Sequence, residues 1–197
     1  HPRPDQRHIK YDDVRELKKN ISVELNIEGN PRENSFVDLV LETLPNQVTL
    51  VPDTTGQLTS DHGWDTIKNK SFLIEMIELF KDNNIRTSLF LNPDEKLIIG
   101  AKEIGTDRIE LYTESYASNF SKDPAKAIKS YVKSANLANE LELGLNAGHD
   151  LNLENLKYFS QNIKALKEVS IGHALISDAL NYGMENIVKM YLRTIKQ

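Results

Sequence analysis

The sequence contains no cysteine among its 197 residues. A disulfide, a thiolate nucleophile and a cysteine-based metal site are therefore excluded, and a reducing compartment is permitted, so we expect a cytoplasmic location. No apolar run reaches the roughly 20 residues that a membrane-spanning helix needs. Positive charge is also not in excess, because 24 Lys and Arg against 29 Asp and Glu give a net charge of −5. We therefore expect neither a nucleic-acid partner nor membrane association.

The chain also lacks an initiator methionine, a low-complexity tract and a Gly/Ser-rich linker. It begins directly with HPRPDQRHI, a stretch that holds two histidines and two arginines. Because no composition shift marks a boundary, we expect residues 1–197 to form a single domain.

Short β-rich runs alternate with longer runs of helical periodicity along the whole chain. SVELNI, from Ser22, precedes the helical pattern NSFVDLVLETL, from Asn34, and QVTLVP then precedes KSFLIEMIELFKDNN. The order repeats down to EVSIGH, from Glu168, and a final helix is expected from about Ala174 to Ile195. Such alternation predicts parallel strands joined by crossover helices, in an α/β fold.

Two architectures satisfy this pattern: an open doubly wound sheet and a closed (β/α)8 barrel. We count about six complete strands, and HPRPD looks like the loop that leaves another one. A barrel needs eight strands, so it would require the body of that strand and one more. Counting alone leaves both architectures open.

The predicted strand ends carry the polar chemistry. In a β/α barrel, reacting groups lie at the carboxyl ends of strands and in the loops that follow. Three of the five histidines, His1, His149 and His173, fall at such positions. The other polar or glycine residues there are Arg3, Glu24, Thr59, Asn92, Glu110, Thr113 and Gly172.

Two glutamates, Glu24 and Glu110, lie within otherwise apolar strands. A buried carboxylate is costly unless paired, and its pKa usually rises. Each could instead point outward or cap a neighbouring backbone. Because both are expected to face histidines across a barrel mouth, we interpret them as acid/base groups.

Two places could bind anions. Gly172 ends the last predicted strand just before a helix, and helix N-termini attract phosphate, although the glycine could merely permit a tight turn. Arg3, Arg7 and His8 could form a second anion pocket, since arginine binds phosphate through two parallel hydrogen bonds. The alternative for these three is a solvated basic tail.

Seven segments occur in an order and spacing that resemble one known family. They are HPRPDQRHI, SVELN, VTLVP, TSLFLNPD, RIELYT, LNAGHDLN and VSIGHALI. With them the chain resembles the pyridoxine 5'-phosphate synthase family of vitamin B6 biosynthesis, from His1 to the C-terminus. The resemblance implies a (β/α)8 TIM barrel with extra helices, assembled as a homo-octamer. It also implies the condensation of 3-amino-2-oxopropyl phosphate with 1-deoxy-D-xylulose 5-phosphate to pyridoxine 5'-phosphate, phosphate and water, with no metal and no organic cofactor.

The resemblance also implies roles for individual residues. His1 and Glu24 would act as general bases, His149 as general acid, and Glu110 would stabilise a transition state. The substrate-binding residues would be Arg3, His8 and Thr59 for the deoxyxylulose phosphate, Asp150 for the amino-ketone, and Gly172 with His173 for a phosphate group.

The chain departs from the family pattern in three places. The N-terminal β/α unit, with an Asn-Ile-Asp-His motif and a substrate-contacting arginine, is missing, so a chain truly starting at His1 is expected to have negligible activity. The loop DTTGQLTSDHG stands where a Glu-Lys-Arg run is typical, and Asp150 stands where glycine is common. The last two departures put the details of phosphate binding in doubt more than the reaction class.

Two other functions remain open on the residues alone. A metal-dependent sugar-phosphate epimerase or isomerase could use His1, His149, His173 and Glu24 as ligands. A non-catalytic barrel could bind phosphorylated metabolites without turnover.

Overall fold

A curled sheet of six parallel strands forms the centre of the protein. The computed structural model describes residues 1–54 and 56–195, and within them the spatial order of the strands equals their order in the sequence. The strands are β1 (Asn26–Gly29), β2 (Gln47–Leu50), β3 (Arg86–Leu91), β4 (Arg108–Tyr112), β5 (Gly144–Gly148) and β6 (Leu166–Ser170). Every neighbouring pair is parallel, as the alternating pattern predicted.

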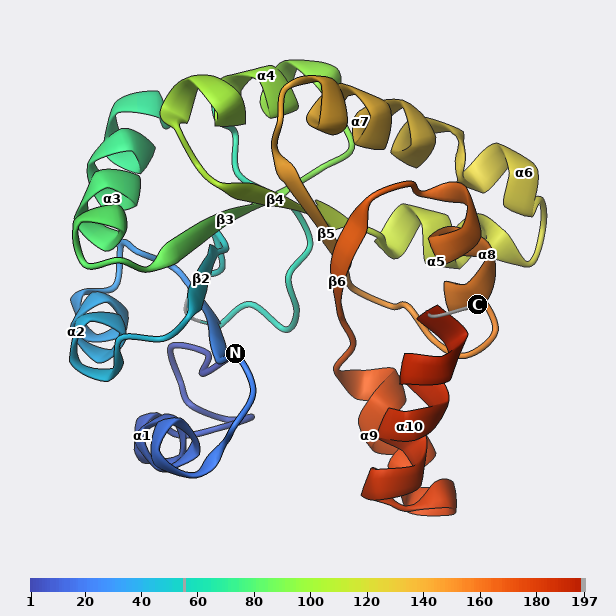
Figure 1. The fold of residues 1–197 in the computed structure, drawn as a ribbon, viewed down its shortest axis with the longest axis horizontal. Helices are drawn as coiled ribbons and strands as arrows, with labels where there is room; N and C mark the ends of the chain where they lie inside the picture. Colours follow the sequence, from blue (N-terminus) through green and yellow to red (C-terminus); the bar gives the residue numbers. More distant parts are fainter. Residues whose placement is uncertain (55, 196–197) are drawn as a thin grey trace.

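Helices connect successive strands and surround the sheet. Figure 1 shows α2, α3, α4 and α7 following one another around its outside, with the α9–α10 pair beyond β6. The helices are α1 (Tyr11–Asn20), α2 (Asn34–Thr43), α3 (Lys70–Asp82), α4 (Glu95–Ile104), α5 (Glu114–Phe120), α6 (Pro124–Ala127), α7 (Lys129–Glu140), α8 (Leu156–Asn162), α9 (His173–Tyr182) and α10 (Met184–Ile195).

The two faces of the sheet differ in polarity because side chains alternate along a strand. The outer face packs against the helices in the main hydrophobic core, to which the strands contribute Ile27, Val48, Leu50, Leu89, Leu91, Ile109, Leu111, Leu145 and Ala147. The inner, concave face carries mostly polar residues, among them Gln47, Thr49, Ser88, Glu110 and Asn146, all buried. A polar interior is suited to holding small polar molecules rather than to packing.

Glu168 of β6 ties the concave face together near the amino ends of the strands. Its carboxylate accepts hydrogen bonds from Gln47 of β2 at 3.1 Å and from Arg108 of β4 at 3.0 Å. The amide of Asn26, on β1, lies 3.4 Å away. Since β1 and β6 are the two ends of the strand order, this last contact shows how far the sheet curls.

Replacing Glu168 by Ala is expected to lower the free energy of unfolding by about 2 kcal/mol, because it leaves a guanidinium and an amide without their acceptor. Urea denaturation measures the change. The matched control is Glu185→Ala on α10, which removes only an exposed pair with Lys189 and is expected to cost less than about 0.5 kcal/mol. Equal effects of the two variants would contradict a stabilising role for the concave network.

Two predicted elements need correction. The first strand begins at Asn26 and not at Ser22. The single helix expected from Ala174 to Ile195 is two helices, separated at Gly183, where φ is +76°. The described residues contain six strands of a curled sheet, so the structure has part of the arrangement expected for a barrel of eight.

Candidate active site

Loops at the carboxyl ends of the strands bring His149 and Thr59 together. His149 follows β5, and its Nε2 lies 2.8 Å from the hydroxyl of Thr59, in the loop after β2. Thr113, which follows β4, donates its hydroxyl to the carbonyls of Gly148 and His149 at 2.7 and 2.5 Å. These bonds hold His149 in a backbone conformation with φ of +90°, which side-chain-bearing residues seldom adopt.

Next to His149, Asp150 also has a positive φ, of +57°. Aspartate tolerates this left-handed region better than most residues, which explains how it occupies a position suited to glycine. Its carboxylate lies 3.0 Å from His149 Nδ1, and its side chain is half-exposed. Asp150 therefore faces both the imidazole and the solvent-accessible side of the site.

The imidazole of His1 lies between two carboxylates. Its Nδ1 is 3.4 Å from Glu28, on β1, and its Nε2 is 3.8 Å from Asp53, which follows β2. Only 14% of the His1 side chain is exposed. A histidine placed in this way has a carboxylate near each ring nitrogen, and the nearer one, Glu28, is placed to exchange a proton with it.

Glu28 and Glu110 form a pair of close carboxylates on the concave face. Burial raises the pKa of Glu28, and the negative charge of Asp53 adds to the rise. Burial, followed by the charge of Glu28, raises the pKa of Glu110 well above its usual 4.5. Gly148 leaves room beside this pair, since a Cβ there would lie 2.2 Å from Glu110 Oε1 and would displace this carboxylate. The raised pKa values suit these groups to proton transfer near neutral pH.

The raised pKa of Glu110 makes the stability of the fold depend on pH. The contribution of protonated Glu110 to the free energy of unfolding is fully present below its ordinary pKa of 4.5. It is lost as the pH rises from there through the raised pKa that Glu110 has in the folded protein. Glu110→Gln has no proton to lose, so at pH 8 its free energy of unfolding is expected to exceed that of the unaltered chain. Urea denaturation across this range should show the two proteins converging at low pH. A difference that did not vary with pH would contradict the assignment.

The N-terminal loop is fastened to the loop after β2. Arg3 donates from Nη1 to Asp53 at 2.9 Å, and Ser60 donates its hydroxyl to the same carboxylate oxygen at 2.6 Å. Arg7 donates to the carbonyls of Gln57 and Leu58 at 2.7 and 2.8 Å. The N-terminal segment, for which a solvated basic tail was the alternative prediction, therefore forms part of the wall of the site.

A second group of predicted residues lies where α9 begins. Gly172 precedes the first turn of α9, which starts with His173, and the ring of His173 is 5.6 Å from that of His8. Burial, and then the charges of Arg3 and Arg7, lower the pKa of His8. The helix N-terminus and the neighbouring cations make this a favourable place for an anion.

Glu24 is not in the site, contrary to the sequence prediction. It precedes β1 at the amino end of the sheet, its side chain is 61% exposed, and it forms an ion pair with Arg86, the first residue of β3. The hydrogen bond from Arg86 lowers the pKa of Glu24, which is the wrong direction for a general base. Glu28, four residues further along the chain and on β1, occupies the position that was expected for Glu24.

Sequence reasoning also missed Asp53 and Tyr112. Tyr112 ends β4, and with Val51 and Phe90 it forms a small apolar cluster separate from the main core. Its ring lies edge-on to that of His149, with centroids 5.0 Å apart. Asp53 follows Pro52 directly after a predicted strand, so its position in the chain was a usable signal for a site residue.

Several buried polar atoms at this edge have no hydrogen-bond partner within the described part of the chain. They are His1 Nε2, Arg3 Nε, Asp53 Oδ1 and Glu110 Oε2. Because buried polar groups are almost always paired, these atoms mark where a polar ligand or water would bind.

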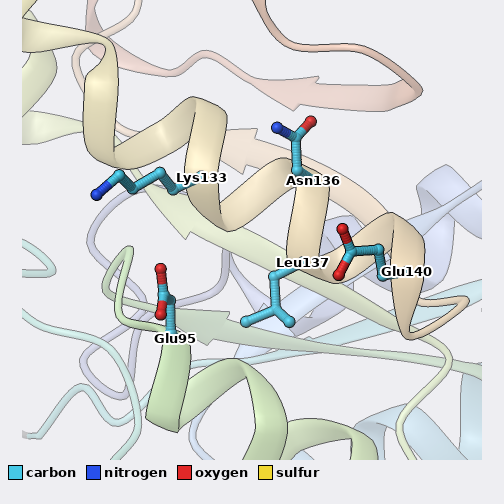
Figure 2. Close-up of a pocket in the computed structure, with 5 residues that line it drawn as sticks. All are labelled: Glu95, Lys133, Asn136, Leu137 and Glu140. Carbon is cyan, nitrogen blue, oxygen red and sulfur yellow. The ribbon is translucent and has the colours of Figure 1, made fainter.

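The metal-ligand set considered from the sequence is not brought together, because Glu24 lies at the opposite end of the sheet from His149. In residues 1–54 and 56–195, no three His, Asp or Glu side chains are grouped as a metal site would need. A surface hollow does exist between α4 and α7, lined by Glu95, Lys133, Asn136, Leu137 and Glu140 (Figure 2). It lies on the outer helical layer, away from the strand ends, and is not the candidate site.

A curled parallel sheet with acid–base side chains at the carboxyl ends of its strands is typical of α/β enzymes with a TIM-barrel-like fold, of which the described residues form a part. The family model of the pyridoxal phosphate biosynthesis protein PdxJ matches residues 1–197. The chain belongs to this family. The family and the class of enzyme predicted from the sequence motifs are thereby confirmed.

The names of curated relatives agree with this family assignment. A pyridoxine 5'-phosphate synthase from Flavobacterium johnsoniae is 59% identical over 196 residues, covering 100% of this chain and 82% of the relative. The protein of the same name from Christiangramia forsetii is 56% identical with the same coverage. Among solved structures, phosphoribosylanthranilate isomerase from Thermotoga maritima is similar with a TM-score of 0.59 and 16% identity, over 96% of this chain and 81% of that one. This last likeness concerns the fold alone.

No helix within the described ranges has the length and apolar character needed to span a membrane.

Proposed function

We propose that this site condenses 3-amino-2-oxopropyl phosphate with 1-deoxy-D-xylulose 5-phosphate to give pyridoxine 5'-phosphate, phosphate and water. Membership of the family and the name of its curated members support the reaction. The observation that carries the proposal is the arrangement of His1 within 3.4 Å of Glu28 at the carboxyl edge of the sheet. The paired Glu110 and the histidine His149 complete the acid–base set.

The reaction needs protons moved repeatedly at near-neutral pH, since imine formation, dehydration, phosphate elimination and ring closure each transfer at least one. His1 and Glu28 act as general bases, with Glu28 in the role first expected of Glu24. A carboxylate with a raised pKa is a stronger base than an ordinary glutamate and accepts a proton more readily at neutral pH.

His149 serves as general acid, and Glu110 stabilises charge in the transition state. The hydroxyl of Thr59 fixes the imidazole of His149 at Nε2. Glu110 has a raised pKa, so it keeps its proton to higher pH and donates a hydrogen bond where oxygen develops negative charge. Tyr112 and Phe90 supply an apolar wall that keeps water from reactive imines.

Two phosphorylated substrates require two anion sites. Arg3, His8 and Thr59 hold the deoxyxylulose phosphate, and the N-terminus of α9, at Gly172 and His173, holds a phosphate group. Asp150 contacts the amino-ketone, since its partly exposed carboxylate can pair with an amine. No metal and no organic cofactor takes part in the proposed reaction.

We further propose that the complete fold is a single-domain (β/α)8 barrel, in which two more strands lie between β6 and β1. Within the described residues β1 and β6 are the edge strands, and each pairs with a neighbour on one side only. An unpaired edge favours the addition of further strands. The working enzyme is proposed to be a cytoplasmic homo-octamer, as the resemblance implies.

The test mixes both phosphorylated substrates with the full-length gene product that contains this chain and follows the absorbance of pyridoxine 5'-phosphate. Product and inorganic phosphate are expected to appear together, and neither when one substrate is omitted. Binding of both substrates without turnover would favour the non-catalytic barrel. A requirement for stoichiometric zinc, iron or manganese would favour a metal-dependent enzyme, and either result would overturn the proposal.

A further inference from the structure

Asp53 connects three segments at the carboxyl edge of the sheet. It follows β2 and is fully buried, with 0% of its surface exposed. One carboxylate oxygen, Oδ2, accepts the hydrogen bonds of both Arg3, at 2.9 Å, and Ser60, at 2.6 Å. The same oxygen lies 3.8 Å from His1 Nε2.

The backbone around Asp53 is itself fixed to the end of β1. Asn30, just after β1, donates from its amide to the carbonyl of Asp53 at 2.9 Å, and the N–H of Val51 donates to Gly29 at 3.0 Å. With its main chain anchored and its side chain enclosed, the carboxylate of Asp53 has a defined place from which it can orient other groups.

The contacts of Asp53 lead to residues that would touch substrate. Ser60 directly follows Thr59, so holding Ser60 sets the place of the Thr59 hydroxyl beside His149. On the other side, Asp53 binds one terminal nitrogen of Arg3 and leaves the buried Nε of Arg3 without a partner in the described structure. That unpartnered N–H is available to an anion.

We propose that Asp53 is a positioning residue for the phosphorylated ketose. It sets the guanidinium of Arg3 and the hydroxyl of Thr59 at a fixed separation, so that the substrate is held against His1 and His149. This inference rests on the proposed function. Asp53 acts by accepting two hydrogen bonds, and its negative charge by itself would weaken the attraction of Arg3 for a phosphate group.

The effect of the hydrogen bonds that Asp53 accepts and the effect of its negative charge can be separated with a pair of variants. Asp53→Asn keeps an acceptor oxygen and loses the charge, whereas Asp53→Ala loses both. If positioning matters, Asp53→Ala raises the KM for 1-deoxy-D-xylulose 5-phosphate and lowers its kcat/KM by about 100-fold, because small misplacements are costly. Asp53→Asn then retains much more activity than Asp53→Ala, and the KM for the amino-ketone stays unchanged in both.

The measurements are steady-state kinetics on the full-length gene product, with thermal unfolding to confirm that each variant folds. Asp61→Asn is the control, because this exposed carboxylate lies in the same loop and contacts His62 and Gln57 instead; it should behave as the unaltered protein. Should Asp53→Ala fail to fold, Ser60→Ala removes one of the two hydrogen bonds and is expected to raise the same KM to a smaller extent.

An unchanged KM for the ketose phosphate in Asp53→Ala, or in Ser60→Ala where the first does not fold, would overturn the inference. So would equal activities of the Asn and Ala variants combined with tighter inhibition by inorganic phosphate, because charge alone would then explain the effect. Absence of product with the unaltered protein would instead refute the proposed function.

Discussion

Replacement of Glu28 by Gln is expected to lower kcat by about a thousandfold while the protein remains folded. The carboxylate lies 3.4 Å from the imidazole of His1, and burial raises its pKa, so it is placed and tuned to accept a proton. Glutamine has nearly the same shape and cannot act as a base at neutral pH. Steady-state formation of pyridoxine 5'-phosphate gives kcat, and circular dichroism checks the fold.

Glu24→Gln is the matched control for this experiment. Glu24 is exposed and paired with Arg86 at the amino end of the sheet, so its variant is expected to keep the kcat of the unaltered protein. The reverse pattern, with Glu24→Gln inactive and Glu28→Gln active, would show that the bases are assigned to the wrong end of β1.

His149→Asn is expected to reduce kcat by roughly 10³- to 10⁴-fold, because it removes the general acid. Asparagine is the suitable replacement, since it tolerates the positive φ of +90° at this position better than alanine would. Its amide can still accept a hydrogen bond from the hydroxyl of Thr59. The loss should therefore appear in kcat, measured under saturating substrates, with little change in thermal stability.

His62→Asn serves as the control for His149→Asn. His62 lies in the loop after β2, is exposed, and pairs with Asp61. A normal kcat is expected for this variant. If His149→Asn also kept full activity between pH 6 and 9, the proton donor would have to be another group, and the role given to His149 would be wrong.

Much of the fold could be predicted from the sequence because its signals are local. Strands β2 to β5 lie within the apolar runs that predicted them, and β6 begins at Leu166, two residues before its predicted run. The helices between the strands follow the helical spacing of apolar residues. The final helix was the exception among the long elements. Gly183, with φ of +76°, divides it into α9 and α10, and periodicity alone does not reveal where a glycine turns the chain.

The error over Glu24 has a geometric cause. In SVELNIEG the residues Glu24, Asn26 and Glu28 alternate with apolar ones, so all three have the same phase of a strand pattern. The pairing of β1 with β2 determines where the strand begins: Asn26 is the first residue of β1 and pairs with Gln47 of β2. Glu24 and Glu28 are then about 13 Å apart along the chain, which places them at opposite ends of the sheet.

The chain alone was enough to predict the alternation of strands and helices, the family, and the candidates His1, Arg3, Glu110 and His149. All of these depend on residue type and spacing, which the chain displays directly. The folded structure was needed to show that Glu28 lies beside His1 and that Asp53 binds both Arg3 and Ser60. These facts depend on the register between strands and on contacts between segments separated in the chain, such as that between Arg3 and Asp53, which are 50 positions apart. The folded sheet, and not the order of the chain, brings such side chains together.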